Sequence, residues 1–215
     1  MKATALIEGY DKLWIKYFPA YLSYKIIKYF FLDHPEYSHL AILADDLIVK
    51  QDDIDHLWYV ANLDTVSFSS LRHSVIAGCC NIDLTTWKDY LNVSFDLPQR
   101  SSYGRHYSFI KKDQAPAAIA QVGFCGTALI IIPRQYVSKL SFDNDARWSG
   151  LDENMGCCQD VIMANDLHDL GVKMFVDFRV NMLHLKQFDG IWFPLSVGVK
   201  APNCKLEIAK HEIDM

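Results

Sequence analysis

Apolar residues are concentrated in a short run at residues 38–49, and polar residues flank it on both sides. A run of this length, bounded in this way, is typical of a strand buried on both faces rather than of a helix. The strand ends in two adjacent carboxylates, Asp45 and Asp46. Two such groups repel each other unless a cation lies beside them, and a hard divalent ion is the usual one. The pattern therefore predicts a buried strand that leads into a metal site.

Two elements are predicted before this strand. Residues 3–7 favour a strand that ends in a loop at Glu8 and Gly9. Pro19 suits the first turn of a helix that stops at 33–35. The helix should carry its apolar side chains on one face and lysines on the other; these are Leu22, Ile26, Tyr29 and Phe30, and Lys25 and Lys28. Strand, helix and strand in this order predict a crossover that makes the two strands parallel.

Further helices and strands are predicted after the acidic pair. Asp52 or Asp53 can cap a helix. Its inward positions are Ile54, Leu57, Trp58 and Ala61. A second helix is expected at 159–170, with Gly171 as its C-terminal stop. Strands are expected at 75–80, 128–133, 172–176 and 180–185, and loops with short strands at 83–115.

Composition and charge narrow the class of protein. The chain has 215 residues, of which 51% are hydrophobic, so one sizeable core and a single domain are expected. The formal charge of -5 and the lack of a basic tract argue against nucleic acid as a partner. The sequence shows no secretory signal and no apolar run of membrane-spanning length, so a cytoplasmic location is expected. The aromatic-rich residues 17–31 leave two alternatives open, a buried helix face or peripheral contact with a membrane, and the helix face is favoured.

The cysteines do not form a metal-binding pattern. The six of them, at positions 79, 80, 125, 157, 158 and 204, include no C-x-x-C pair. Buried free thiols are therefore expected, and a disulfide between the two doublets is the alternative.

Four features stand in a definite order along the chain. Asp45 and Asp46 end a strand, a glycine-containing segment at 123–127 precedes another, Asp160 opens a helix, and His184 follows the next strand. Over residues 1–190 this order resembles the GT-A fold glycosyltransferases, which transfer a sugar from a nucleotide-sugar donor to an acceptor hydroxyl. It looks most like the compact versions that archaeal viruses carry, for which the cytoplasm would be that of the host.

The resemblance implies a fold and a division of the chain. The expected fold is α/β of the GT-A (nucleotide-diphospho-sugar transferase) type, a Rossmann-like mixed sheet flanked by helices in a single domain over 1–215. Residues 1–85 would be the nucleotide-sugar-binding half and 86–190 the acceptor-binding and catalytic half. Residues 191–215 would be a C-terminal tail.

The resemblance also implies roles for particular residues. Asp160 would be the general base of an inverting transfer, and Asp46 and His184 would hold Mn²⁺ or Mg²⁺ on the donor diphosphate. Glu8, Asp45 and Asp46 would bind the nucleotide-sugar donor. The acceptor, a glycan, protein or lipid, would be bound by Gly126, Thr127, Trp148 and Gln159.

Two departures from the family pattern keep alternatives open. Ala44 stands where the first acid of the family's DxD element is expected, and Gln159 replaces the acid that usually precedes the base. Both departures favour a degenerate GT-A module that binds a glycan or a protein without turnover. A sugar nucleotidyltransferase is the other alternative, but residues 8–11 lack the glycine-rich, basic loop that such enzymes use for a triphosphate.

Overall fold

The structure is a computed structural model of the whole chain. It describes residues 13–16, 20–44, 47–63, 71, 73–82, 89–97, 99–101, 104–106, 108–142, 159–188, 191–194 and 205–208. The predicted first strand at 3–7 lies outside these ranges, as do Asp45 and Asp46.

The described residues form four α-helices, one 3-10 turn and fourteen strands. The helices are α1 (Ala20–Asp33), α2 (Gln51–Ala61), α3 (Arg134–Val137) and α4 (Gln159–Asp169), and the turn is η3 (Lys112–Gln114). The strands of the first half are β1 (Leu13–Lys16), β2 (His39–Leu43), β3 (Leu47–Ile48), β4 (Val75–Cys80), β5 (Tyr90–Ser94), β6 (Gln99–Ser101) and β7 (Gly104–His106). Those of the second half are β8 (Phe109–Lys111), β9 (Ile119–Val122), β10 (Phe124–Cys125), β11 (Leu129–Pro133), β12 (Met174–Phe188), β13 (Ile191–Pro194) and β14 (Lys205–Ile208).

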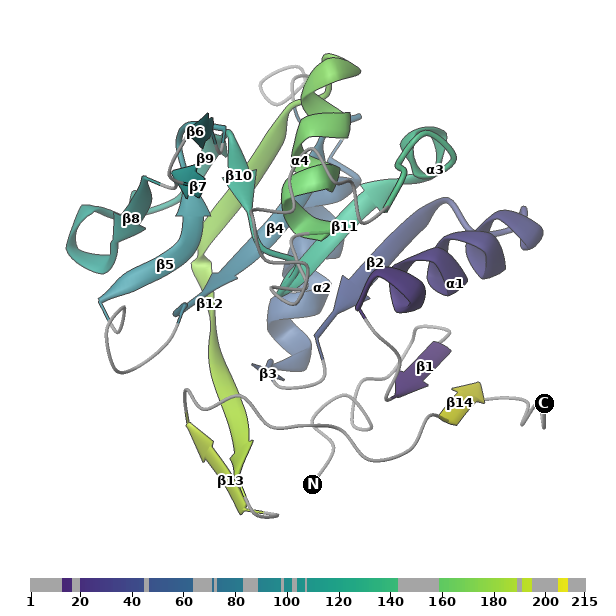
Figure 1. Cartoon of the computed structure of the whole chain (residues 1–215), viewed down its shortest axis with the longest axis horizontal. Helices are drawn as coiled ribbons and strands as arrows, with labels where there is room; N and C mark the ends of the chain where they lie inside the picture. The colour runs from purple at the N-terminus through teal and green to yellow at the C-terminus, as the bar shows by residue number, and fades with distance from the viewer. Residues whose placement is uncertain are drawn as a thin grey trace.

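The largest sheet is mixed and runs in the order β13-β12-β4-β11-β2 (Figure 1). Strands β4 and β12 are parallel, whereas β11 is antiparallel to both of its neighbours. Two further strands, β3 and β9, pair with β12 in antiparallel fashion. A separate three-stranded sheet has the order β10-β5-β8. The fold class is therefore α/β, with a mixed sheet flanked by helices in one domain.

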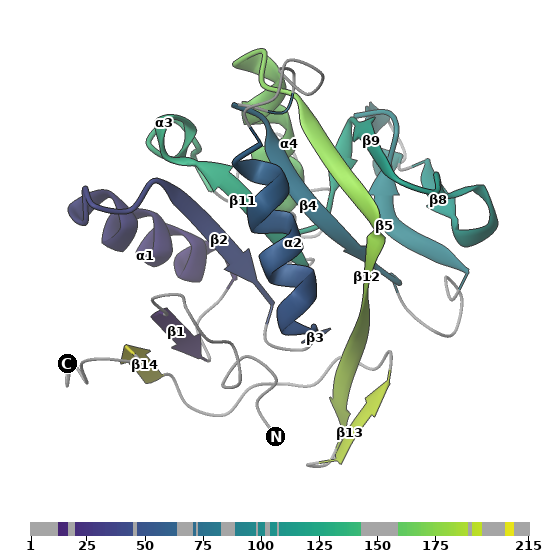
Figure 2. The ribbon, with the colours of Figure 1, turned by 180° about the vertical axis from the view of Figure 1, so that it is seen from behind.

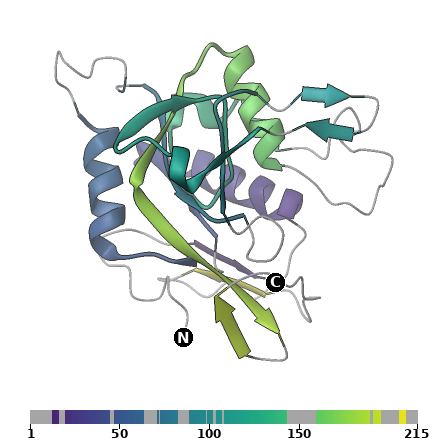
Figure 3. The same cartoon turned by 90° about the vertical axis from the view of Figure 1, so that its left-hand side faces the viewer.

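Helices cover both faces of the large sheet. Helix α4 lies on the face seen in Figure 1 and α2 on the opposite face seen in Figure 2, and Figure 3 shows the two layers from the side. We call the apolar cluster under α2 the α2-side core; it includes Leu47, Ile54, Leu57, Ile76, Leu129, Val180 and Met182. The cluster under α4 and α1 is the α4-side core; it includes Phe31, Ala77, Ile130, Val161, Leu167, Met174 and Val176.

Several sequence predictions are confirmed. Strands β4 and β11 are buried along their whole length. Helix α4 begins at Gln159, and Gly171 follows it with a φ of +69°, the left-handed conformation that glycine adopts at helix ends. Cys79, Cys80 and Cys125 are buried free thiols. The other three cysteines lie outside the described residues.

The strand predicted at residues 38–49 differs from the prediction in two ways. His39–Leu43 forms β2, and Leu47–Ile48 forms a separate strand, β3, which pairs with β12. Strand β2 is also not buried on both faces, because Leu40 and Ile42 are buried while Ala41 between them is exposed. The reason is position, since β2 is the last strand on its side of the sheet.

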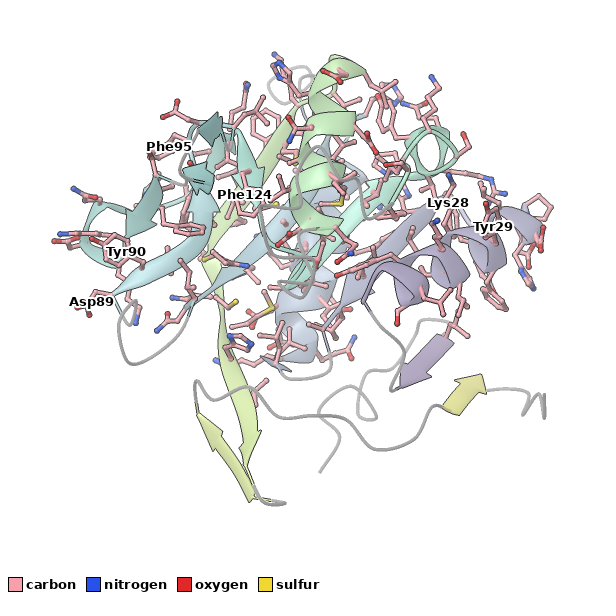
Figure 4. All side chains as sticks on the ribbon, viewed as in Figure 1. Lys28, Tyr29, Asp89, Tyr90, Phe95 and Phe124 are labelled. Atoms are coloured by element: carbon pink, nitrogen blue, oxygen red, sulfur yellow. The ribbon has the colours of Figure 1, made fainter. Side chains whose placement is uncertain are left out.

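The buried face of α1 was predicted wrongly. Tyr29 is 62% exposed, and Figure 4 labels it on the C-terminal half of α1. Phe31 belongs to the α4-side core, and Tyr24, Ile27 and Leu32 pack against it. Lys28, predicted to face solvent, donates a hydrogen bond from Nζ to the carbonyl oxygen of Leu140 at 2.6 Å. Helix α1 carries apolar residues on all of its faces, so its sequence pattern alone does not show which face is buried.

Two smaller predictions also need correction. Helix α2 is preceded by Lys50 as its N-cap, without a side-chain cap, so Asp52 and Asp53 lie inside the first turn. The two strands expected at 172–176 and 180–185 are one strand, β12, interrupted by a register shift between Val176 and Asn181. None of the described helices is long and apolar enough to cross a membrane.

Candidate active site

One edge of the large sheet gathers most of the predicted site residues that the structure describes. Strand β2 ends there, and the backbone N–H of Ala44 donates to the carbonyl oxygen of Ala128 at 3.0 Å. Leu43 of β2 pairs with Leu129, so the segment before β11 meets the end of β2. The parallel strand β4 ends at the same edge with Cys80 and Asn81. Ligands of open α/β sheets bind beyond such carboxyl ends.

His184 reaches this edge from β12. It pairs in register with Leu47 of β3, the residue that directly follows Asp46 in the sequence. Its Nδ1 lies 3.3 Å from the carbonyl oxygen of Asn81. A carbonyl oxygen only accepts, so Nδ1 carries the proton, and in a neutral ring Nε2 then has the lone pair.

This arrangement of His184 fits a divalent metal. Histidines that bind metals commonly donate their other ring N–H to a backbone carbonyl, which fixes the tautomer and the ring orientation. No group of three or more His, Cys, Asp or Glu side chains gathers into a metal site among the described residues. The predicted partner ligand, Asp46, is not among those residues, so the fit concerns His184 only.

Asp160 opens the first turn of α4, where the helix dipole favours an acid. Its Oδ1 accepts a hydrogen bond from the backbone N–H of Val161 at 2.9 Å. Burial raises the pKa of the Cys125 thiol to about 12, and the charge of Asp160 adds to that rise. Helix α4, which Asp160 opens, also contacts β10, the strand that comes directly before Gly126 and Thr127.

Gly126 is required by a close approach. Its backbone N–H donates to the carbonyl oxygen of Asn92 at 2.8 Å, and a Cβ at this position would lie 2.8 Å from Asn92 Nδ2. Asn92 Oδ1 in turn accepts from the backbone N–H of Cys80 at 2.9 Å. The asparagine thus joins β5, the end of β4 and the segment before β11.

Thr127 is held from α1. Its Oγ1 is hydrogen-bonded to the hydroxyl of Tyr24, whose ring stacks on Phe142 at 5.3 Å between centroids. Gln159, the other described residue of the predicted acceptor site, is only 5% exposed. Its amide therefore lies in the protein interior at the start of α4.

The structure thus brings part of the predicted set toward one edge. Hydrogen bonds and strand pairing connect His184, Asn81, Asn92, Gly126 and the end of β2 there, and Asp160 opens the helix that contacts β10. The remaining predicted residues, Glu8, Asp45, Asp46 and Trp148, lie outside the described residues. Sequence reasoning missed Asn92 and Tyr24, because single polar residues in apolar elements follow no periodic pattern, and it missed Asn81 because this residue contacts His184 through its backbone carbonyl.

A cavity of about 490 Å³ opens at a different place. It lies between the end of β5 and the turn that joins α4 to β12, and its polar side chains include Asp96, His168 and Lys173. His168 belongs to the last turn of α4, whereas Asp160 belongs to the first. The cavity is therefore separate from the edge that carries His184.

Comparison with known proteins gives no family. No protein-family model matches the chain, and no curated protein matches its sequence. Among solved structures the chain is similar to the crystal structure of A197 from STIV, at 14% sequence identity and a TM-score of 0.47. That similarity covers 85% of this chain and 79% of A197.

Proposed function

We propose that this chain is a metal-dependent glycosyltransferase of the GT-A fold. It would move a sugar from a nucleotide-diphosphate donor to the hydroxyl of a glycan, protein or lipid acceptor, with inversion at the anomeric carbon. The observation that carries the proposal is the pairing of His184 with Leu47, because it brings the histidine next to the segment that follows Asp45 and Asp46.

His184 and Asp46 are the metal ligands in this proposal. The Nδ1–H of His184 is directed to the Asn81 carbonyl, which supports coordination through Nε2. One nitrogen and one carboxylate ligand, completed by diphosphate oxygens and water, suit Mn²⁺ or Mg²⁺. When bound, such an ion stabilises the negative charge that develops on the departing diphosphate.

Asp160 is the general base. A hydroxyl is a weak nucleophile until its proton is removed, and the carboxylate of Asp160, in the first turn of α4, would remove it. A single base on the face opposite the leaving group gives inversion. Thr127, which is half-buried, would contact the acceptor on this side, and the buried Gly126 and Gln159 would hold the segments around it.

A second candidate is a binding module of the same fold that recognises a glycan without turnover. Gln159 favours it, because this buried residue is an amide where the resemblance expects an acid. The two candidates differ in their use of metal. A transferase should bind nucleotide diphosphates in the presence of Mn²⁺, and a glycan-binding module should not.

The decisive experiment is a thermal-shift screen of the full chain against nucleoside diphosphates and their sugar conjugates, with and without Mn²⁺. A ligand that binds only the folded state at 100 times its Kd adds about 2.7 kcal/mol to the free energy of unfolding. We expect a rise in Tm that requires both nucleotide and Mn²⁺. No such rise with any nucleotide would overturn the proposal.

Two substitutions then assign the roles. Asp46→Ala should remove the Mn²⁺-dependent rise, and Asp52→Ala in α2 is its control. Asp160→Asn should keep donor binding but slow transfer about 10²- to 10⁴-fold, the usual contribution of a general base. Asp169→Asn, at the exposed end of α4, is the matched control. Wild-type rates in Asp160→Asn would remove the assignment of the base.

A further inference from the structure

Strand β12 carries an insertion within its pairing to β4. Val176 pairs with Ala77, and Asn181 pairs with Cys79. Five positions of β12 therefore stand against two of β4, which leaves three extra residues in β12. The insertion is a β-bulge, a feature that typically re-aims the side chains beyond it.

An odd number of extra residues reverses the alternation of side chains along a strand. The reversal is visible in the two cores. Val176 belongs to the α4-side core, whereas Val180 and Met182 belong to the α2-side core, although all three positions are even-numbered. His184 follows Met182 by two positions, and its strand partner Leu47 also belongs to the α2-side core. The bulge therefore decides on which face of the sheet His184 lies.

Asp177 holds this bulge together. Its side chain is completely buried and accepts hydrogen bonds from three N–H groups of Arg179. The backbone N–H and Nε of Arg179 donate to Oδ1 at 3.1 and 2.8 Å, and one terminal nitrogen donates to Oδ2 at 2.6 Å. These bonds close the chain over two residues within the inserted segment. A buried carboxylate with this many donors is costly to remove.

His56 attaches the bulge to α2. Its Nε2 donates to Asp177 Oδ2 at 2.7 Å. Helix α2 begins three residues after β3, the strand that pairs with His184. Burial alone would raise the pKa of Asp177, but the hydrogen bonds from Arg179 and His56 outweigh it and hold the pKa below its ordinary value. The carboxylate therefore stays charged, and the connection between α2 and β12 persists at neutral pH.

We propose that His56, Asp177 and Arg179 are positioning residues for the metal site, because they fix the β12 bulge that sets the face of His184. They touch neither substrate nor metal in this role. The inference rests on the proposed function only where it names the metal. Its structural part, the control of His184 by a cluster whose Asp177 lies seven residues before it in the sequence, is measurable without any ligand.

The first test uses the ligand-free chain and reads the His184 imidazole. In wild type, nitrogen-15 NMR should show the His184 imidazole as the tautomer with the proton on Nδ1. The signal is assigned to His184 because it should be absent in His184→Gln. His56→Ala should change that signal, whereas His56→Gln should restore it because the glutamine amide places a donor near the position of Nε2. Asp55→Asn, on the exposed side of α2, is the control.

The second test reads the bulge through Cys79. Its Sγ–H donates to the carbonyl oxygen of Val180 at 3.6 Å, inside the inserted segment. Burial raises the pKa of this thiol to about 12, and the charge of Asp177 contributes. Alkylation of Cys79, followed by peptide mass spectrometry, should be negligible in wild type and His56→Gln and rapid in His56→Ala. Asp177→Asn, if it folds, should behave as His56→Ala does.

The third test connects the cluster to the metal. Substitution of groups that orient a metal ligand usually weakens metal affinity about 10- to 100-fold. His56→Ala should weaken Mn²⁺-dependent nucleotide binding by that factor while the chain remains folded at the assay temperature, and Asp55→Asn should not. Wild-type Mn²⁺ affinity in His56→Ala would overturn the positioning role and leave the proposed function intact.

The outcomes separate the two proposals. If wild type shows no Mn²⁺-dependent nucleotide binding, the proposed function fails, and the first two tests still decide whether the cluster controls His184. An unchanged His184 signal together with an unreactive Cys79 in His56→Ala would overturn the inference whatever the function is.

Discussion

The two ends of the large sheet use polar groups for different purposes. At the end opposite the candidate site, the guanidinium of Arg134 lies within hydrogen-bond distance of four carbonyl oxygens, those of Phe31, Leu32, His34 and Tyr37. At the site end, Asn81, Asn92 and Tyr24 each make a bond that orients one neighbour, respectively His184, the Cys80 backbone and Thr127. At the Arg134 end the hydrogen bonds satisfy the carbonyl groups around the C-terminus of α1. At the site end they orient the residues of the candidate site.

We therefore expect substitutions at the Arg134 end to lower the stability of the fold, and substitutions at the site end to change the position of site residues. Arg134 donates to carbonyls in the last turn of α1 and just after it, and its cation lies at the negative end of the helix dipole. Removal of such a group should lower the free energy of unfolding without changing the geometry of the candidate site. The side chains of Asn92 and Tyr24 satisfy few groups each, so their loss should alter the site more than the fold.

The largest expected effect is at the stabilising end. Arg134→Ala should lower the free energy of unfolding by about 2–4 kcal/mol, because several carbonyls lose a charged donor and the contact with the Phe31 ring at 4.8 Å is lost. Urea denaturation followed by circular dichroism measures it. Lys139→Ala, an exposed cation nearby, should change stability by less than about 0.5 kcal/mol. Equal effects of the two substitutions would contradict the comparison.

Gly126, at the candidate site, and Gly171, at the end of α4, allow a second test of the difference between the two regions. Gly126→Ala should cost about 1–3 kcal/mol, because the new Cβ would lie 2.8 Å from Asn92 Nδ2 and forces a shift in a packed region. It should also weaken nucleotide or acceptor binding, since it displaces the segment at the site edge. Thermal unfolding and the Mn²⁺-dependent shift measure the two effects.

Gly171→Ala should cost about 1 kcal/mol for a different reason. No atom lies within 4 Å of a Cβ at this position, but the φ of +69° disfavours alanine. Asparagine tolerates this conformation, so Gly171→Asn should be nearly neutral, whereas Gly126→Asn should be worse than Gly126→Ala. Thermal unfolding of the four variants checks the order, and a reversed order would contradict the two explanations.

A smaller effect is expected from the Tyr24 hydroxyl. Tyr24→Phe removes the bond to Thr127 but keeps the ring on Phe142, so the loss of stability should be about 1 kcal/mol. If Thr127 contacts the acceptor, the KM for acceptor should rise while donor binding is unchanged. Tyr136→Phe, which loses a bond to the His73 carbonyl away from Thr127, is the control.

The last prediction is confined to acid pH. The pKa of Asp177 is lower in the folded chain than in the unfolded chain, so its contribution to stability is present above the ordinary pKa of an aspartate. The contribution is lost as the pH falls through the lower, folded value. Asp177→Asn should therefore flatten the fall of Tm below about pH 4 relative to wild type. An unchanged slope would show that Asp177 is not charged in the fold.

Local patterns in the sequence were enough to predict several helices and strands. Periodic apolar residues identified α2 and α4, unbroken apolar runs identified β4 and β11, and Gly171 marked the end of α4. These signals depend on residues within one or two turns of each other, which is why sequence reasoning located them. Asp160, Gly126, Thr127 and His184 could be singled out because they stand at the ends of such elements or in a family-like order.

The packing of these elements against one another became known only from the tertiary structure. The face of α1 depended on the sheet beneath it, because apolar residues surround that helix. The face of His184 depended on three extra residues in β12, held by a histidine 121 positions away from its aspartate partner. Contacts over such separations leave no local pattern in the sequence, so the connection between α2, the bulge and the candidate metal ligand became visible only in the folded chain.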